Sequence, residues 1–187
     1  VLLGINGRLV NALQRHGAHA VGLSGEEGRM LATRPAAGPD GEDLGFVGEV
    51  EEVDTSVLDF SLGRDMIPVV SPVGAGPEGP YNVNADLAAA SLAVALGAQK
   101  IVLLTNIEGL YADLGDKDSL ISETTVGQLE KLLEGGALTE GMIPKITAVI
   151  RALRAGVPQA HILDGRVAHA LLLEVFTQEG VGTMVLP

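Results

Sequence analysis

The sequence predicts an α/β fold with a mainly parallel sheet sandwiched by helices. Residues 66–73 form a continuous apolar run of the kind found in strands covered on both faces, and residues 100–105 (KIVLLT) predict another buried strand. Stretches of helical length alternate with such runs along most of the chain, among them the alanine-rich residues 85–96. This alternation favours parallel strands joined by crossover helices, and it places ligand sites beyond the carboxyl ends of the strands.

The first half of the chain is predicted to begin with a helix that carries Leu2, Leu9 and Leu13 and ends at Gly17, because glycine readily adopts the backbone that closes a helix. Turn-forming residues 35–41 separate two extended stretches with the character of exposed hairpins. After the helix we expect, in chain order, a strand over residues 19–23, extended stretches over 29–34 and 44–53, a helix capped by Asp54 that runs to Leu62, and the strand over 66–73.

The second half repeats strand and helix. Gly97 ends the alanine-rich helix, and Pro144 suits the first turn of a later one. We expect, in chain order, a strand over residues 100–105, helices over 125–134 and 144–154, a strand over 161–163, a helix over 167–176 and a strand over 182–186. Loops at residues 74–84, 106–118 and 135–144 fall where this type of fold builds its site.

Residues 74–79 match the G-x-G-x-x-G string of dinucleotide-binding turns. That motif requires a helix to begin within it, whereas Pro77 and Pro80 interrupt this segment and Tyr81 continues in extended form. We therefore interpret residues 74–79 as a flexible loop. The chain contains no G-x-x-x-x-G-K-[ST] string, and Gly22-Leu23-Ser24-Gly25 falls short of a serine-hydrolase elbow.

The length, net charge and cysteine content of the chain exclude several classes of function. A chain of 187 residues that is 47% hydrophobic can bury a core and form one domain or one lobe of a larger one. Its net charge of −12 offers no basic surface for nucleic acid or an anionic membrane, and no apolar run is long enough to cross a bilayer. The absence of cysteine favours an intracellular, cytoplasmic setting. The four histidines lack metal-ligand spacing, so we expect no resident metal site.

Asp86 lies in the stretch Asn82-Val83-Asn84-Ala85-Asp86, at the start of the alanine-rich helix. It is the only ionisable residue between Tyr81 and Lys100, so a carboxylate is held among otherwise apolar, close-packing residues. One interpretation is a functional acid. The alternative is an ordinary first-turn acid that follows an Asn84 cap.

Lys145 lies in the stretch Gly141-Met142-Ile143-Pro144-Lys145, at the start of another helix. A cation in the first turn opposes the helix dipole unless an anion is also present, and phosphate fits such a place. A nearby carboxylate would hold the ammonium in position. The alternative is that this lysine simply points into water. The combination of the two stretches favours phosphoryl chemistry.

Several stretches together resemble the amino-acid kinase family, most closely its acetylglutamate kinases, which phosphorylate the γ-carboxylate of N-acetyl-L-glutamate in arginine biosynthesis. The resemblance runs the length of the chain. The stretches that carry it are residues 44–50, 67–71, 82–86, 103–111, 141–145, 161–166 and 180–183. The pair NVNAD and GMIPK is the most specific part.

The resemblance implies a role for each matching residue. Asp86 would orient the catalytic lysines, and Lys145 would neutralise charge on the transferred phosphoryl group. Asn82 and Asn84 would hold the substrate. The residues implied for ATP are Asn106, Ile107, Glu108, Gly109, Leu110, Tyr111, Ala137, Leu138 and Thr139. Asn106 stands where relatives often carry aspartate, which leaves hydrogen bonding intact.

The resemblance also implies ATP and Mg²⁺ as cofactors, a homo-oligomer and an arginine effector. His161, Glu174 and Gly180 match the spacing of an arginine site, where the Glu174 carboxylate would pair with a guanidinium. The alternative is that His161 simply starts a strand and Glu174 lies on a solvated helix face.

Residues 1–187 would then form a single, partial amino-acid-kinase domain, with the nucleotide-binding C-terminal lobe and part of the substrate lobe. The helix in which the chain opens predicts that the fold is N-terminally truncated, without a first strand, a lysine-bearing glycine loop and a triple-glycine loop. Two rival functions remain: another carboxylate or carbamate kinase of the family, and a non-catalytic nucleotide-binding remnant or regulatory module. The fragment alone is expected to bind nucleotide without turnover.

Overall fold

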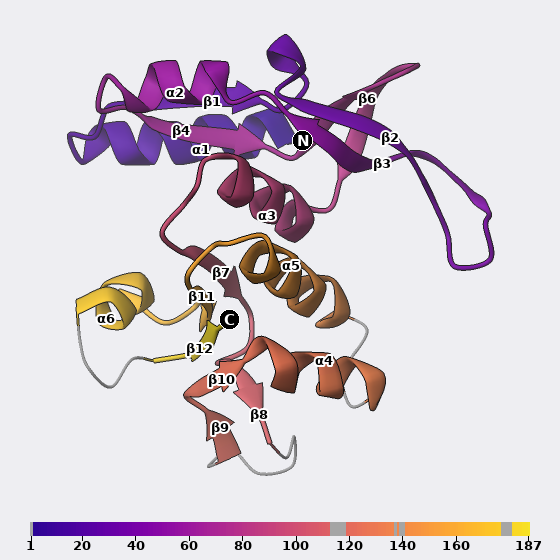
Figure 1. The fold of residues 1–187 in the computed structure, drawn as a ribbon. Helices are drawn as coiled ribbons and strands as arrows, with labels where there is room; N and C mark the ends of the chain where they lie inside the picture. Colours follow the sequence, from indigo (N-terminus) through magenta and orange to yellow (C-terminus); the bar gives the residue numbers. More distant parts are fainter. Residues whose placement is uncertain (1, 113–118, 137, 139–140, 177–180) are drawn as a thin grey trace. The chain divides into compact units, whose positions relative to one another are not determined.

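The computed structural model describes residues 2–112, 119–136, 138, 141–176 and 181–187. The chain forms two compact units, Val1–Ala95 and Leu96–Pro187. Strands and helices alternate in both, which confirms the predicted α/β class (Figure 1).

In the first unit, β1 (Ala20–Ser24) and β4 (Ile67–Ser71) form a parallel pair in register from Ala20 opposite Ile67 to Ser24 opposite Ser71. Helix α1 (Leu2–Arg15) packs against both strands, and α2 (Ser56–Leu62) packs against β4. Figure 1 shows the two helices on opposite sides of the pair. The Asp54 carboxylate accepts the N–H of Ser56 at 2.9 Å, so it does serve the start of α2.

The buried side of α1 includes a polar residue. Leu9 is 53% exposed, whereas Asn6 is buried and donates to the carbonyls of Leu23 and Val69 at 3.2 and 2.6 Å. An added Cβ at Gly22 would lie 2.3 Å from the Asn6 side chain, so α1 approaches β1 closely here. A buried amide needs hydrogen-bond partners, and Asn6 finds them in carbonyl groups of β1 and β4, which holds the helix against both strands.

Four further strands of the first unit close into a small barrel in the order β2-β3-β6-β5. Their bounds are β2 (Leu31–Ala37), β3 (Asp43–Val53), β5 (Val73–Gly76) and β6 (Gly79–Val83), and the short helix η1 (Glu27–Arg29) precedes β2. The stretches interpreted as exposed hairpins are one antiparallel pair, β2 with β3. Exposure varies along the pair: Phe46 is 59% exposed, whereas Leu31 is fully buried.

The interpretation of residues 74–79 as a flexible loop was wrong, because β5 and β6 form a tight antiparallel hairpin with Gly76 opposite Gly79. A Cβ added at Gly76 would lie 2.1 Å from the Tyr81 ring, so the glycine makes room for this packed aromatic. Pro77 and Glu78 form the turn between the two strands, so the local turn signal marks a hairpin rather than a loop. Helix α3 (Ala85–Ala95) follows β6, and its Ala88 packs with Leu31 and Val83 in the core.

The second unit has a mixed four-stranded sheet in the order β10-β12-β11-β7. The strands are β7 (Ile101–Thr105), β10 (Glu123–Thr125), β11 (Ala160–Asp164) and β12 (Thr183–Leu186). β7 and β11 are parallel, as are β10 and β12, whereas β11 and β12 are antiparallel. A small hairpin of β8 (Leu110–Tyr111) and β9 (Leu120–Ile121), which the sequence did not predict, lies beside this sheet.

Helices cover this sheet. Helix α4 (Val126–Glu134) begins after Thr125, whose N–H donates to Gln128 at 3.0 Å. Helix α5 (Ile143–Arg154) packs on β7 and β11, and α6 (Ala170–Phe176) packs on β11 and begins three residues later than predicted. All five residues of β11 are buried.

Burial of two predicted strands is only partial. Ile67 of β4 is 44% exposed and Leu104 of β7 is 56% exposed, and Pro72 separates β4 from β5 within the run of residues 66–73. A proline cannot donate to a strand ladder. In the described sheets both strands lie at an edge, where one neighbour is missing.

Candidate functional site

In the first unit, the end of β6 and the start of α3 position Asn82, Asn84 and Asp86. Asn82 is exposed on β6, and its neighbours across the barrel strands are Val47 and Val73. The Asn84 side-chain oxygen accepts the N–H groups of Asp86 and Leu87 at 3.0 and 3.1 Å, so Asn84 caps α3. Asp86 is half-buried in the first turn of α3. Three polar side chains within five residues thus gather at one helix start.

In the second unit, Lys145 occupies the first turn of α5, with Pro144 just before it and the buried Met142 at the N-cap. No acidic residue lies in that turn, and Lys145 is half-buried. The helix N-terminus and the ammonium therefore present positive potential together, which suits an anion. Leu138 is half-buried before this helix, and Ala137 and Thr139 lie outside the described residues.

The loop from Asn106 to Gly109 follows the carboxyl end of β7 and leads into β8. Asn106 and Glu108 are exposed, and Ile107 is half-buried. A Cβ added at Gly109 would lie 2.5 Å from Oγ1 of Thr183, so the loop backbone presses against β12. Glycine is required by this approach.

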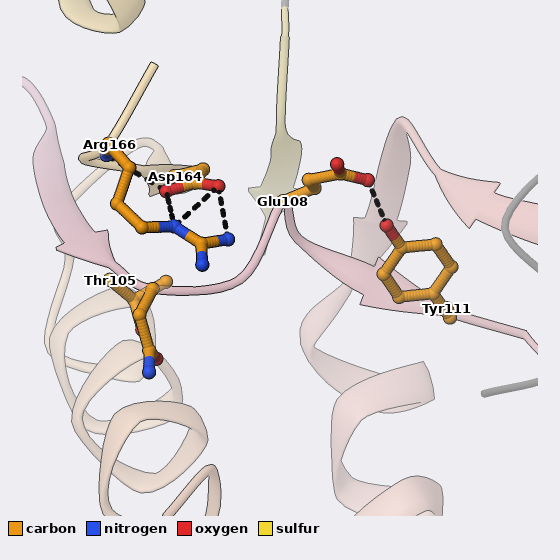
Figure 2. A network of polar contacts seen from close by, with 6 residues as sticks. Thr105, Glu108, Tyr111, Asp164 and Arg166 are labelled. Atoms are coloured by element: carbon orange, nitrogen blue, oxygen red, sulfur yellow. Dashed lines mark hydrogen bonds and ion pairs between the residues drawn. The ribbon is translucent and has the colours of Figure 1, made fainter.

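Figure 2 shows two polar pairs on this loop and its neighbour. The Tyr111 hydroxyl donates to the Glu108 carboxylate. This hydrogen bond, followed by burial and by the negative charges of Glu108 and Asp164, raises the pKa of Tyr111, which therefore stays a donor at neutral pH.

The second pair joins Asp164 and Arg166 at the carboxyl end of β11. Arg166 Nη2 and Nε donate to Asp164 Oδ2 and Oδ1 at 2.7 and 2.9 Å, and the Arg166 N–H also donates to Oδ1 at 2.8 Å. These hydrogen bonds lower the pKa of Asp164. The side chain of Asp164 is 6% exposed and that of Arg166 is 67% exposed, so a buried carboxylate orients an exposed guanidinium.

The loops after β7 and β11 are also joined by their backbones, because Gly165 N–H donates to the Thr105 carbonyl at 2.8 Å. The sequence analysis includes Asp164-Gly165-Arg166 in the stretch 161–166 but predicts no role for these three residues. Two charged residues in a turn directly after a buried strand could have indicated a site here.

His161 and Glu174 do meet. His161 Nδ1 and Glu174 Oε1 are 2.7 Å apart, both side chains are 6% exposed, and Glu174 Oε2 accepts the Val181 N–H at 2.8 Å. Burial raises the pKa of Glu174, but the hydrogen bonds from Val181 and His161 outweigh it and leave the pKa below its ordinary value. The alternative of a solvated Glu174 is therefore wrong. Gly180 lies outside the described residues.

Comparison with known proteins decides the family, since the family model "Amino acid kinase family" matches residues 1–164. The chain belongs to the amino acid kinase family. Curated relatives include the acetylglutamate kinases of Moorella thermoacetica, 49% identical, and Acidothermus cellulolyticus, 53% identical. Each alignment covers the whole of this chain, which spans 66% of the length of either relative.

Solved structures agree with the kinase fold. N-acetylglutamate synthase from Neisseria gonorrhoeae, complexed with coenzyme A and L-arginine, matches with a TM-score of 0.77 and 30% identity over 90% of this chain and 38% of that one. An isopentenyl phosphate kinase matches with a TM-score of 0.69 over 97% of this chain and 65% of that one, at 19% identity. At that identity the second match shows the fold alone.

Within the described residues, no group of three His, Cys, Asp or Glu side chains is placed to hold a metal ion. In the same part of the chain, no helix has the length and apolar character needed to span a membrane.

Proposed function

We propose that this chain acts in the ATP-dependent phosphorylation of the γ-carboxylate of N-acetyl-L-glutamate, a step of arginine biosynthesis. The observation that carries the proposal is the identity of about half of all positions, over the whole chain, with proteins named acetylglutamate kinase. The stretches NVNAD and GMIPK, on which the resemblance is most specific, both begin helices in the structure.

In this proposal Asn82 and Asn84 hold the acetylated substrate. Asp86 orients the catalytic lysines, and Lys145 neutralises charge that develops on the phosphoryl group. Support for Lys145 comes from its place in the acid-free first turn of α5, where the helix dipole adds to its charge. Transfer is direct and in line, so positioning and charge neutralisation supply most of the rate.

The nucleotide would occupy the loop Asn106–Tyr111 together with Ala137, Leu138 and Thr139. This loop offers Asn106 and Glu108 as exposed hydrogen-bonding groups at the carboxyl end of a parallel strand. Mg²⁺ would enter with the triphosphate, because Mg²⁺ keeps waters and phosphate oxygens as ligands and needs few protein groups. When bound, it shields the phosphate charge during transfer.

Regulation by arginine, a homo-oligomer and a cytoplasmic location are further parts of the proposal. His161, Glu174 and Gly180 would bind the effector. Because the Glu174 carboxylate already contacts His161 and accepts the Val181 N–H, arginine would have to replace the His161 contact or share the carboxylate with it. Kinase activity measured during titration of arginine into wild type and Glu174→Ala tests this proposal. Equal inhibition of both proteins would show that arginine does not act through these residues.

A coupled assay of ADP release tests the reaction with the protein at its natural length. N-acetyl-L-glutamate should support turnover, whereas carbamate and free aspartate should not. Turnover with another carboxylate or with carbamate alone would favour a different kinase of the family. Calorimetric binding of ADP without turnover of any of the three would favour the non-catalytic nucleotide-binding module.

A further inference from the structure

We propose that Thr183 is a positioning residue for the nucleotide loop, and that the Glu174 carboxylate sets Thr183 in place. The inference rests on the proposed nucleotide site, and it assigns the control of that site to two buried residues on other elements. Thr183 begins β12 and Glu174 lies on α6, whereas the loop follows β7.

The Thr183 hydroxyl joins both strands of the β8–β9 hairpin. It accepts the N–H of Leu110 at 2.8 Å and donates to the carbonyl of Ile121 at 2.7 Å. Thr183 is fully buried, so no water competes for these groups. Each of the two strands has only two residues, so they have few ladder bonds of their own. A side-chain oxygen 73 residues away in sequence therefore fixes where the loop ends.

The loop also lies tightly against Thr183. A Cβ added at Gly109 would be 2.5 Å from Thr183 Oγ1 and 3.2 Å from its backbone nitrogen. Gly109 and Leu110 thus contact the same threonine, one by close approach and the other by a hydrogen bond. Loss of the hydroxyl would remove the hydrogen bond at the end of the loop, and it would leave a buried donor and acceptor unpaired.

Glu174 fixes the chain just before Thr183. Its Oε2 accepts the Val181 N–H at 2.8 Å, and the N–H of Gly182 also donates to the carboxylate. Its Oε1 contacts His161 of β11, so the carboxylate is itself held. A Cβ added at Gly182 would lie 2.3 Å from the Ile162 carbonyl, which leaves residues 181–183 little room to shift.

The contacts form one continuous connection: His161 to Glu174, Glu174 to Val181 and Gly182, and then Thr183 to Leu110 and Ile121. All of these groups lie in the second unit. The position of the nucleotide loop is therefore decided by the beginning of β12, and the beginning of β12 by α6.

The matched variants are Thr183→Val and Thr183→Ser in the protein at its natural length. Valine keeps the shape and removes the hydroxyl, whereas serine keeps the hydroxyl. We expect Thr183→Val to weaken ADP binding in calorimetry and to raise KM for ATP, each by about tenfold, because the lost hydroxyl leaves the Leu110 N–H and the Ile121 carbonyl without their partner. KM for N-acetyl-L-glutamate should change less than about twofold, and Thr183→Ser should restore nucleotide affinity.

Hydrogen exchange of the Leu110 amide supplies a readout that does not depend on activity. It should quicken in Thr183→Val and stay protected in Thr183→Ser, while amides of β11 keep their protection. Should Thr183→Val fail to fold, Glu174→Gln tests the same connection from its other end. Glutamine retains one acceptor for Val181 but loses the charge, so Leu110 protection and ADP affinity should both fall.

Unchanged ADP affinity in folded Thr183→Val would overturn the inference, as would a rise in the KM of both substrates by the same factor. If wild type binds no ADP, the proposed nucleotide site fails and this inference fails with it. If wild type binds ADP and Thr183→Val binds it equally, only the positioning role of Thr183 is lost.

Discussion

The two units hold their candidate site residues in different ways. In the first unit Asn82, Asn84 and Asp86 lie within one stretch of five residues, and the Asn84 cap on α3 is a contact between residues two and three apart. In the second unit the loop after β7 is held by Gly165, which follows β11, and by Thr183, which begins β12. A site built from neighbouring residues, here called a local site, should tolerate substitutions elsewhere in its unit. A site held by residues from other strands, here called an assembled site, should be sensitive to substitutions in those strands.

Removal of the Lys145 charge should have the largest effect of any single change. Lys145→Ala should lower kcat by about 10³-fold with a modest change in KM, because the charge matters most when the phosphoryl group moves. Lys131→Ala on α4 is the matched control, since it removes one exposed cation from the same unit. Steady-state kinetics that place Lys145→Ala within a few-fold of wild type would contradict its role.

A test of the assembled site is to crowd Gly109. The added methyl of Gly109→Ala would meet Thr183 Oγ1 at 2.5 Å, so the loop must move. We expect a rise of about tenfold in KM for ATP and a loss of about 1–3 kcal/mol in the free energy of unfolding. Gly127→Ala in α4 meets nothing within 4 Å and should stabilise by about 1 kcal/mol through helix propensity. Equal changes in the free energy of unfolding of the two variants, measured by denaturant titration, would contradict the close contact between Gly109 and Thr183.

The local site of the first unit can be probed through its cap. Asn84→Ala leaves the N–H groups of Asp86 and Leu87 without their acceptor and should cost about 1 kcal/mol of unfolding free energy. Asn84→Asp keeps an acceptor and should cost less. Chemical denaturation measures both. Because we assign nucleotide binding to the second unit, neither variant should change the affinity for ADP. A change in ADP affinity would contradict that assignment.

The smallest expected effect is the pH dependence of the Asp164–Arg166 pair. Because hydrogen bonds from Arg166 lower the folded-state pKa of Asp164, the pair contributes stability that is fully present above the ordinary pKa of 3.8 and is lost as pH falls through the lower folded-state pKa. The difference in melting temperature between wild type and Asp164→Asn should therefore stay constant from neutral pH to about pH 5 and shrink below pH 4. A difference that persists in full at pH 2 would show that the pair does not act through its charge.

Most of the elements could be predicted because their signals are local. Apolar runs, the Asn84 cap, Pro144 at the start of α5 and the glycine that ends α1 each act within a few residues. The same holds for the candidate residues at the two helix starts. Their roles as substrate and phosphate groups are still predictions, as is the effector site, although His161 and Glu174 do meet.

Only the tertiary structure decided the remaining features. Residues 74–79 form a hairpin of the barrel, and close packing of α1 on β1 buried Asn6 and left Leu9 outside. Thr183 gained its contacts through strands 62 and 73 residues away. For Asn6 and Thr183 the physical reason is the same: a buried polar group must find a partner, and which partner it finds depends on the strands that the fold brings beside it. The sequence alone determines which groups can donate, accept or cap, whereas the assembled strands determine which of them meet.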